Sequence, residues 1–426
     1  MADEKTNKIY VYRYTPYGVE ITLDQNYAIT DGSISYLYIV HDFEQRRLPI
    51  IKIHIDLEAE TIEKMYKYKD TGKIKLSIKE QQIDSTEKVI NSRNYLDYVF
   101  SYIPAKDQNE YLTSKDIETE SVADEMSKYQ SFECYLIDMD AVNWFTKQIS
   151  VNFHNASKPA ILHALLEMRN IPYGKVIATP PQDYSNVKNA VFPYGDLIGN
   201  ILLLNHKYGI YNFTPTIYYD LHYLYCVNRL NPNIILNQHN DYGEVLFLLY
   251  NSTDPSREAE GSYDDTEAKT HVINIKQDPV ITNAQQKKTS SKFATVTTIN
   301  KKGKVSKQTT AINKNTITKT SSSETPSAMA YAYAYNNLTQ DQLINDNLAK
   351  GRTIDLIINN INLSALRPYK RYSFQVDTQF VNMDLNNKTF KLRAWGTVIS
   401  RDGGRSEKSI YIHTTNISLF EQTTGK

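Results

Sequence analysis

The chain has 426 residues, which is too long for one ordinary hydrophobic core and indicates two to four domains. Hydrophobic residues make up 41% and charged residues 23%, as in ordinary globular proteins. The 48 basic and 48 acidic side chains give a formal net charge of zero. No global charge therefore indicates a nucleic acid or an anionic membrane as partner.

Tyrosine is strongly enriched, with 33 tyrosines against 2 tryptophans. A tyrosine has a wide apolar ring and a polar tip, which suits half-buried strand faces and subunit interfaces. A carbohydrate-binding surface would use the same residue. The enrichment therefore favours a binding or assembly role over a catalytic role, without identifying the partner.

The two cysteines, Cys134 and Cys226, lie far apart in strand-like surroundings. A disulfide framework needs more cysteines, so we expect two buried free thiols and folding in a reducing cytoplasm. Residues 1–8 are polar and no apolar segment follows them, so we expect no secretory signal. The apolar runs, such as residues 201–204, are far too short to span a membrane.

Residues 1–149 are predicted to form a tube-like β-barrel region. Residues 56–67 have a helical period, and a turn is expected at 15–18. Several strands around one short helix indicate a small barrel or sandwich. Residues 107–130 are polar and form either a loop or an exposed helix. The predicted strands are 8–15, 34–40, 51–55, 73–79 and 132–139.

Residues 150–232 are predicted to form a compact α+β module. Ser157 can cap a first amphipathic helix. A second helix is expected over 197–208, with Gly209 as its stop. The expected strands are 210–213 and 216–227, the latter broken by a turn at 220–222.

The rest of the chain is predicted to contain two strand-rich parts separated by an arm. Residues 233–286 form a β-rich connecting region, and residues 351–426 return to strands that complete a second barrel. Between them, residues 287–350 form a Lys/Ser/Thr-rich arm and a helical connector. Up to residue 327 the only acid of the arm is Glu324. The composition favours a mobile or partner-ordered arm, and a hairpin turning at 301–304 is the alternative.

The search for chemistry finds no strong catalytic or metal-binding motif. Asp138 and Asp140 lie two residues apart, and paired carboxylates can hydrolyse glycosides, but a solvated strand end is the simpler interpretation. The acidic loop 262–267 lacks the ligand order and central glycine of an EF-hand. No paired-histidine zinc spacing, phosphate loop or nucleophile elbow occurs. We therefore predict a non-enzymatic protein with no catalytic residues, no metal and no cofactor.

The basic arm is the one feature that could contact nucleic acid. Its candidate residues for lining a DNA path or contacting a partner are Lys301, Lys302, Lys304 and Lys307. Without arginines or interleaved aromatic rings, such lysines give weak, salt-sensitive phosphate contacts. A solvated surface arm is the simpler interpretation.

One ordered run of motifs lies between Val151 and Tyr225. It contains the segments 151–156, 159–168, 191–194, 206–211, 218–221 and 223–225. The run resembles the central hub proteins of phage tail baseplates, the T4-like baseplate hub and its relatives in other tails. A Tyr-Gly-Ile-Tyr sequence after an amphipathic helix, followed by a Tyr-Leu-Tyr strand, carries most of this resemblance, which is one of shape rather than catalysis.

The resemblance implies a homotrimer whose chains each contribute two tube-like barrels to a pseudo-sixfold ring. Such a ring joins the tail tube to the central spike and lets DNA pass. The implied partners are the tail tube protein, the spike or needle, other baseplate proteins and the tape measure protein. The implied location is the virion tail, after assembly in the host cytoplasm. The expected fold class is mainly β with an α+β insertion: tail-tube-like β-barrels plus a small α+β domain.

Two other functions stay open. A receptor- or glycan-binding tail protein would use tyrosine-rich strand faces, although such proteins usually contain tandem β repeats and none is visible here. A cell-wall hydrolase is the weaker alternative, because no acid pair stands out. Asp138→Asn should abolish its activity.

Overall fold

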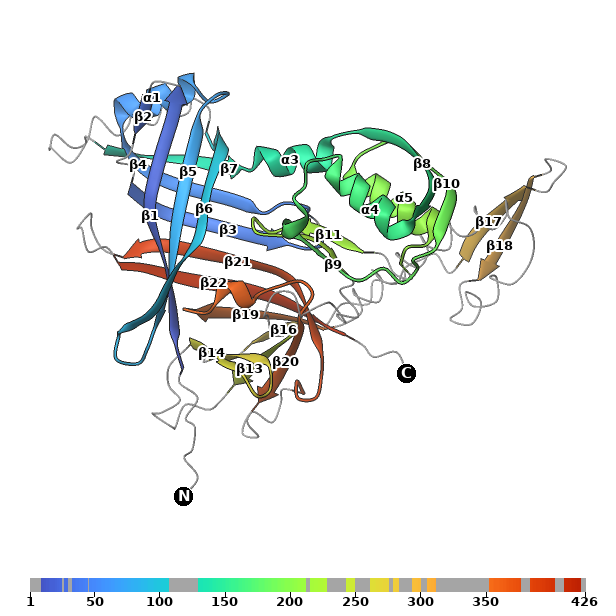
Figure 1. The fold of residues 1–426 in the computed structure, drawn as a ribbon. Coiled ribbons are helices and arrows are strands. Elements are labelled where there is room, and N and C mark those ends of the chain that lie inside the picture. Colours follow the sequence, from blue (N-terminus) through green and yellow to red (C-terminus); the bar gives the residue numbers. More distant parts are fainter. Residues whose placement is uncertain are drawn as a thin grey trace.

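Strands dominate the computed structural model of this chain, and a small α+β insertion interrupts them, which confirms the predicted fold class. Figure 1 shows a large curved sheet with the insertion at one side. The structure describes residues 9–24, 27–29, 33–44, 46–106, 129–211, 215–227, 243–249, 261–275, 279–282, 293–299, 305–311, 352–376, 384–402 and 410–422.

The main body is one 15-stranded sheet. Its strands are β1 (Val11–Asp24), β2 (Tyr27–Ile29), β3 (Ser33–Asp42), β4 (Ile50–Glu58), β5 (Lys73–Ile83), β6 (Val89–Pro104), β7 (Tyr129–Ile137), β13 (Glu244–Leu249), β14 (Gly261–Asp265), β15 (Thr270–Ile275), β16 (Val280–Thr282), β19 (Thr353–Asn359), β20 (Arg371–Val376), β21 (Phe390–Asp402) and β22 (Ile410–Glu421). The main path runs β14-β15-β13-β20-β21-β3-β4-β7-β6-β5-β1-β2, and β22, β19 and β16 branch from β21. Because β21 pairs with β3, strands from both ends of the chain share one sheet.

The sheet forms because alternate side chains of its strands are apolar and pack into one core. In β4, Ile51, Ile53 and Ile55 are buried, while Lys52 and His54 point to the other face. The same alternation in β5 buries its isoleucines and leaves its lysines outside. The predicted helix after β4 is confirmed as α1 (Ala59–Lys67), which begins three residues late because β4 continues to Glu58.

Two local predictions are wrong. The turn expected at 15–18 is absent because β1 continues through it, and a register shift between Pro16 and Gly18 accommodates the proline. The strand expected at 210–213 is also absent in its described part, since the two described residues there belong to no strand. The first error comes from a local turn signal that the pairing of β1 with β5 overrides.

The sheet curls until its two ends meet, which makes it a nearly closed barrel. Tyr10 and Ser262 exchange backbone hydrogen bonds of 3.1 and 2.9 Å, and the N–H of Tyr12 donates to the carbonyl of Asn360 at 2.9 Å. Gly261 permits this approach, because a Cβ atom there would lie 2.5 Å from the carbonyl oxygen of Tyr10. The first strand therefore closes the barrel against strands from the later part of the chain.

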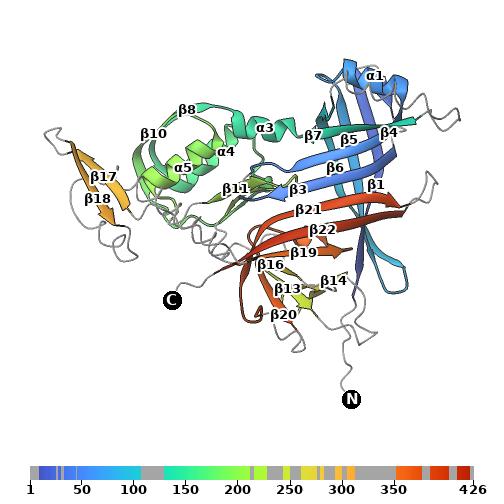
Figure 2. The same cartoon turned by 180° about the vertical axis from the view of Figure 1, so that it is seen from behind.

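The α+β module leaves the barrel after β7 and lies at its side in both views (Figures 1 and 2). Its elements are α3 (Met139–Thr146), β8 (Ile149–Ser157), α4 (Lys158–Glu167), η2 (Tyr173–Lys175), β9 (Val176–Ala178), β10 (Asn186–Gly195), α5 (Leu197–Tyr208), β11 (Thr216–Tyr219) and β12 (Leu224–Val227). Both predicted helices are confirmed: Ser157 caps α4, and Gly209 ends α5 with a φ of 71°. No helix in the described ranges is long and apolar enough to cross a membrane.

A hairpin of β17 (Phe293–Ile299) and β18 (Val305–Ala311) stands apart from the barrel and beyond the module in both views. The two strands pair antiparallel, as the alternative interpretation of the arm as a hairpin predicts. The turn at 301–304, the predicted connector before residue 350 and the polar segment 107–128 lie outside the described residues.

Candidate functional site

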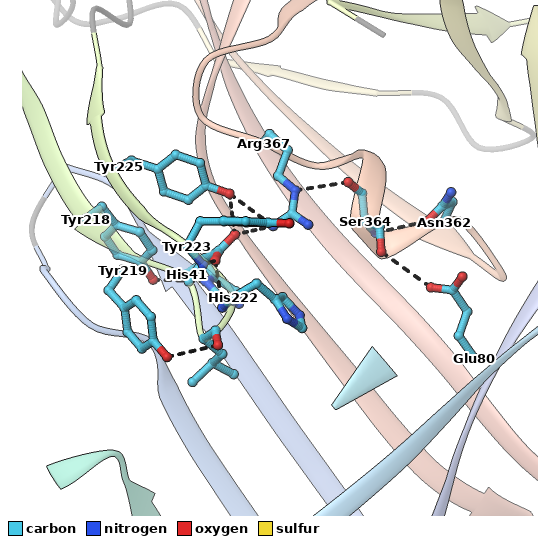
Figure 3. Close-up of polar contacts among 12 residues, drawn as sticks. His41, Glu80, Tyr218, Tyr219, His222, Tyr223, Tyr225, Asn362, Ser364 and Arg367 are labelled. Carbon is cyan, nitrogen blue, oxygen red and sulfur yellow. Dashed lines mark hydrogen bonds and ion pairs between the residues drawn. The ribbon is translucent and has the colours of Figure 1, made fainter. Parts of the chain in front are cut away.

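A buried polar network joins the module to the barrel (Figure 3). Its side chains come from the turn between β11 and β12, from the loop around the 3₁₀ turn η5 (Leu363–Ala365), and from barrel strands β1, β3, β5 and β6. Figure 3 shows His41 of β3, Glu80 of β5, the tyrosines of β11 and β12, and Arg367 converging from segments far apart in the sequence.

Asp220 lies at the centre of the network and is 5% exposed. Its Oδ1 accepts hydrogen bonds from the backbone N–H groups of His222 at 3.0 Å and Tyr223 at 2.7 Å, which forms the turn. Its Oδ2 accepts a hydrogen bond from the Tyr225 hydroxyl at 2.6 Å. The same oxygen forms an ion pair with the guanidinium of Arg367. The turn sequence therefore orients the carboxylate toward the loop that carries the arginine.

Arg367 reaches this carboxylate from the segment after η5. Its Nε donates to the carbonyl of Ser364 at 3.1 Å, and its Nη1 also donates to the Tyr225 hydroxyl at 3.1 Å. The guanidinium carbon lies 5.7 Å from the centroid of the Tyr223 ring. Burial is the largest influence on the pKa of Asp220 and would raise it, but the charge of Arg367, the nearby histidines and the Tyr225 hydrogen bond together keep this pKa below its usual value.

Glu80 holds the same loop against the barrel. Its Oε2 accepts a hydrogen bond from the Tyr14 hydroxyl at 2.9 Å, and its Oε1 accepts one from Arg93 Nε at 2.6 Å. Arg93 Nη2 also donates to Ser364 Oγ at 3.0 Å, and the Tyr14 hydroxyl accepts from the N–H of Leu363 at 2.8 Å. Strands β1, β5 and β6 thus position the segment that supplies the arginine.

Three histidines lie in or beside this network, and two of them, His41 and His222, contact the other part of the protein. The Nδ1 of buried His41 is 3.0 Å from the Tyr218 hydroxyl, and its ring stacks on Trp395 with centroids 4.2 Å apart. Burial lowers the pKa of His41 to about 3. Burial also lowers the pKa of half-buried His222 and of buried His413 to about 4. All three rings are therefore neutral at pH 7.

This network can orient two parts of the protein, because each central charge is buried with its partner. Buried ion pairs are weak sources of net stability but penalise any arrangement that separates the charges. Within the part of the chain that the structure describes, no group of three or more His, Cys, Asp or Glu side chains is arranged to hold a metal ion. The geometry is that of a docking contact.

Asp138 and Asp140, the acid pair of the sequence, have separate structural positions. Asp138 is 7% exposed and caps α3, since its Oδ1 accepts the N–H of Ala141 at 3.0 Å. The same oxygen accepts the Tyr98 hydroxyl at 3.0 Å, whereas Asp140 is exposed. The interpretation of Asp138 as a solvated strand end is therefore wrong.

The acidic segment 262–267 forms part of the β14–β15 hairpin rather than an open ion-binding loop. The Oδ1 of Asp265 accepts the N–H groups of Glu267 at 3.0 Å and Ala268 at 2.9 Å. The carboxylate therefore stabilises the turn.

Cys134 and Cys226 are buried and free, which confirms the expectation from the sequence. Three of the predicted contact lysines, Lys301, Lys302 and Lys304, lie outside the described residues. Lys307 lies in β18, where its backbone pairs with Thr297. The role of these lysines remains a prediction.

A second feature is a surface that we call the tyrosine face, on the side of β3, β4, β7 and β6 that points away from the core. The strand register places Tyr38 beside Lys52, Lys52 beside Tyr135, and Tyr135 beside Ile103. Lys52 forms an ion pair with Glu133, so this cation is compensated within the face. A groove of about 370 Å³ on this face is lined by Tyr36, Tyr38, Ile50, Lys52, His54 and Tyr135.

Sequence reasoning missed the docking network. Asp220 is identifiable only as a turn residue, and its partner Arg367 lies 147 positions away. Neither Glu80 nor Arg93 has a local pattern that distinguishes it from a solvated charge. The sole signal is the interruption of the 216–227 strand by an aspartate, which indicates a turn but no partner.

Comparisons with known proteins give one family match. A family model described as the bacteriophage PBS1 gene 109 protein matches residues 17–394. No curated protein matches the chain.

Several solved structures are distantly similar. A tail protein from Neisseria meningitidis has 10% identity and a TM-score of 0.47, with 96% of this chain and 97% of that chain covered. A type VI secretion component of E. coli, described as similar to the T4 bacteriophage tail proteins gp27 and gp5, has 10% identity and a TM-score of 0.41, with 96% and 78% covered. A PdpA–VgrG complex of Francisella has 8% identity and a TM-score of 0.38, with 99% and 59% covered.

Proposed function

Since the chain belongs to the family of the bacteriophage PBS1 gene 109 protein, we propose that it is a structural protein of a phage tail and assembles with copies of itself. The proposed assembly is a trimeric hub, a pseudo-sixfold ring that joins the tail tube to the central spike and lets DNA pass. The phage family, the resemblance of residues 151–225 to baseplate hubs and the nearly closed β-barrel support this proposal.

The tyrosine face is the observation that carries the assembly part of the proposal. Val99, Ile103 and Tyr135 are 52%, 53% and 39% exposed, although they lie on central strands of the sheet. A sheet face that meets water is normally polar. Contiguous exposed apolar side chains mark contact surfaces, and tyrosine is enriched in them.

The chemistry of the face fits a protein partner better than a nucleic acid. Its central cation, Lys52, is engaged by Glu133 and lies 5.8 Å from the centroid of the Tyr135 ring. A phosphate backbone would instead need several uncompensated cations. Rings and aliphatic side chains therefore supply most of the available contact area.

Light scattering on the purified protein over a range of concentrations tests the trimer. We expect a trimeric mass for the wild type and a monomeric mass for Ile103→Glu and Tyr135→Glu, with unchanged circular dichroism. Tyr194→Glu is the matched control, because Tyr194 is 75% exposed on β10 of the module, away from the face. A wild-type monomer at the highest concentration would contradict the proposal.

The alternative is a receptor- or glycan-binding tail protein, and the tyrosine-lined groove is the observation that favours it. Imaging of tagged virions separates the two functions. A hub lies on the tail axis beneath the tube, whereas a receptor-binding protein lies at the periphery. Binding of host cell-wall polymer by the isolated protein, lost in Tyr38→Ala, would support the alternative.

A further inference from the structure

The contact between the module and the barrel combines a few specific hydrogen bonds with a gap in the packing. The N–H of Tyr219 donates to the carbonyl of Arg47 at 3.0 Å, and Arg47 Nη1 donates to the carbonyl of Ile217 at 3.4 Å. A cavity of about 150 Å³ lies between Leu48 and Leu136 of the barrel and Tyr219 of the module. This pocket is partly open, so the two parts do not fill all the space between them at this point.

Two neutral histidines belong to this contact. His41 comes from β3 of the barrel and meets Tyr218 of β11 in the module. His222 comes from the module and meets Tyr95 of β6, with ring centroids 5.3 Å apart. Each histidine therefore has at least one neighbour on the other side of the contact, although the His41 ring also stacks on Trp395 of its own side.

The surroundings of both rings are mixed in charge. Asp220 favours their protonation, but this carboxylate is already engaged by Arg367. Arg93 and Lys175 add further positive charge near His222 and oppose its protonation. Arg367 opposes the protonation of both rings, and His222 opposes that of His41. The hydroxyls of Tyr95 and Tyr218 also face the rings.

We propose that the α+β module docks reversibly on the barrel and that protonation of His41 and His222 releases it. Docking buries the His41 ring and partly shields the His222 ring from water while both are neutral. Undocking returns them to water, where an imidazole takes up a proton near neutral pH. Acid therefore draws the equilibrium toward the undocked form by mass action.

The direction and the pH window follow from the lowered pKa values. In the docked form the pKa of His41 is about 3 and that of His222 about 4, against an ordinary value of 6.5. Docking is therefore fully favoured above pH 6.5 and weakens progressively as the pH falls toward these values. With two protons taken up, the undocking constant rises by up to roughly 100-fold per pH unit between about pH 6 and about pH 4, the docked pKa of His222.

Hydrogen exchange of the full chain, followed by mass spectrometry and corrected for intrinsic rates, tests this proposal. Between about pH 7.5 and about pH 5 we expect peptides from β11 and β12 to lose protection while those from β4 and β5 keep it. The double variant His41→Phe/His222→Gln should be insensitive to pH over this range, and the phenyl ring that replaces the imidazole keeps the stacking on Trp395. His154→Gln is the matched control, because His154 is exposed on β8 and bonds Asn189 at 2.7 Å, so the wild-type response should persist.

Two results would overturn the proposal: loss of protection in barrel and module strands together, or an unchanged pH response in the double variant. If the double variant does not fold, His222→Gln alone replaces it. That single variant should reduce the pH response to roughly 10-fold per unit, and an undiminished response would again overturn the proposal. None of these readings depends on whether the protein forms a trimer.

Discussion

The docking network and the tyrosine face use the same kind of residue in opposite ways. In the network, Tyr14 and Tyr225 are fully buried, and their hydroxyls bond Glu80 and Asp220. On the face, Tyr135 is 39% exposed and leaves its ring accessible. Burial requires every polar atom to be paired, whereas exposure leaves aromatic surface available for a partner. Burial therefore decides whether a tyrosine specifies the fold or offers a contact.

The two regions should also respond differently to substitution. In the network, removal of one partner leaves a charge that water cannot reach. On the face, water solvates whatever side chain is introduced. Substitutions in the network should therefore change the free energy of unfolding, and substitutions on the face should change assembly alone.

The largest effect is expected for Arg367→Met, which leaves Asp220 buried without its cation. The free energy of unfolding should fall by about 3–5 kcal/mol, measured by urea denaturation at pH 7. Arg371→Met is the matched control, because Arg371 and Glu244 are 49% and 46% exposed and their pair should contribute less than about 1 kcal/mol. Equal effects of the two substitutions would remove the distinction between network and surface.

The next effect concerns the closure of the barrel, which depends on close packing rather than on charge. Gly261→Ala should destabilise the protein by about 1–3 kcal/mol, because its Cβ would lie 2.5 Å from the carbonyl oxygen of Tyr10. Thermal unfolding measures this change. Gly174→Ala, with no heavy atom within 4 Å of its Cβ, should have little effect. If both variants unfold alike, the closure of the barrel does not require glycine.

A smaller effect is expected for Tyr225→Phe, which removes one hydroxyl from the network and keeps the ring. Asp220 keeps Arg367 and two backbone donors, so the loss should be about 1–2 kcal/mol in urea denaturation. Tyr194→Phe on the exposed surface should be neutral. A neutral Tyr225→Phe would show that the ion pair alone holds the contact.

The smallest effect on folding is expected for Ile103→Lys on the tyrosine face. Because Ile103 is 53% exposed, the free energy of unfolding of the monomer should change by less than about 0.5 kcal/mol. Chemical denaturation at low protein concentration measures it, alongside the mass of the assembly. A loss above about 1 kcal/mol would mean that this face belongs to the core of the fold rather than to a contact surface.

Local signals identified the elements of this protein better than their partners. The cap at Ser157 and the stop at Gly209 are determined by short-range backbone chemistry, so both helices could be predicted. The alternation in β4 likewise determined a strand and its buried face. The turn expected at 15–18 failed because the pairing of β1 with β5 continues through it. Pro16 and Gly18 indicate that the strand ends, but the pairing with β5 continues and contains a register shift between these two residues.

The sequence by itself determined the β-rich class, the α+β insertion and two buried thiols, because these depend on local periodicity and composition. Only the tertiary structure decided that Tyr10 closes the barrel against Ser262, and that Asp220 meets Arg367. Such contacts join residues separated by more than 100 positions, and a single sequence contains no periodic or spacing signal for them. Burial then decides the role of each tyrosine, because the same side chain pairs its hydroxyl inside the protein and presents its ring outside.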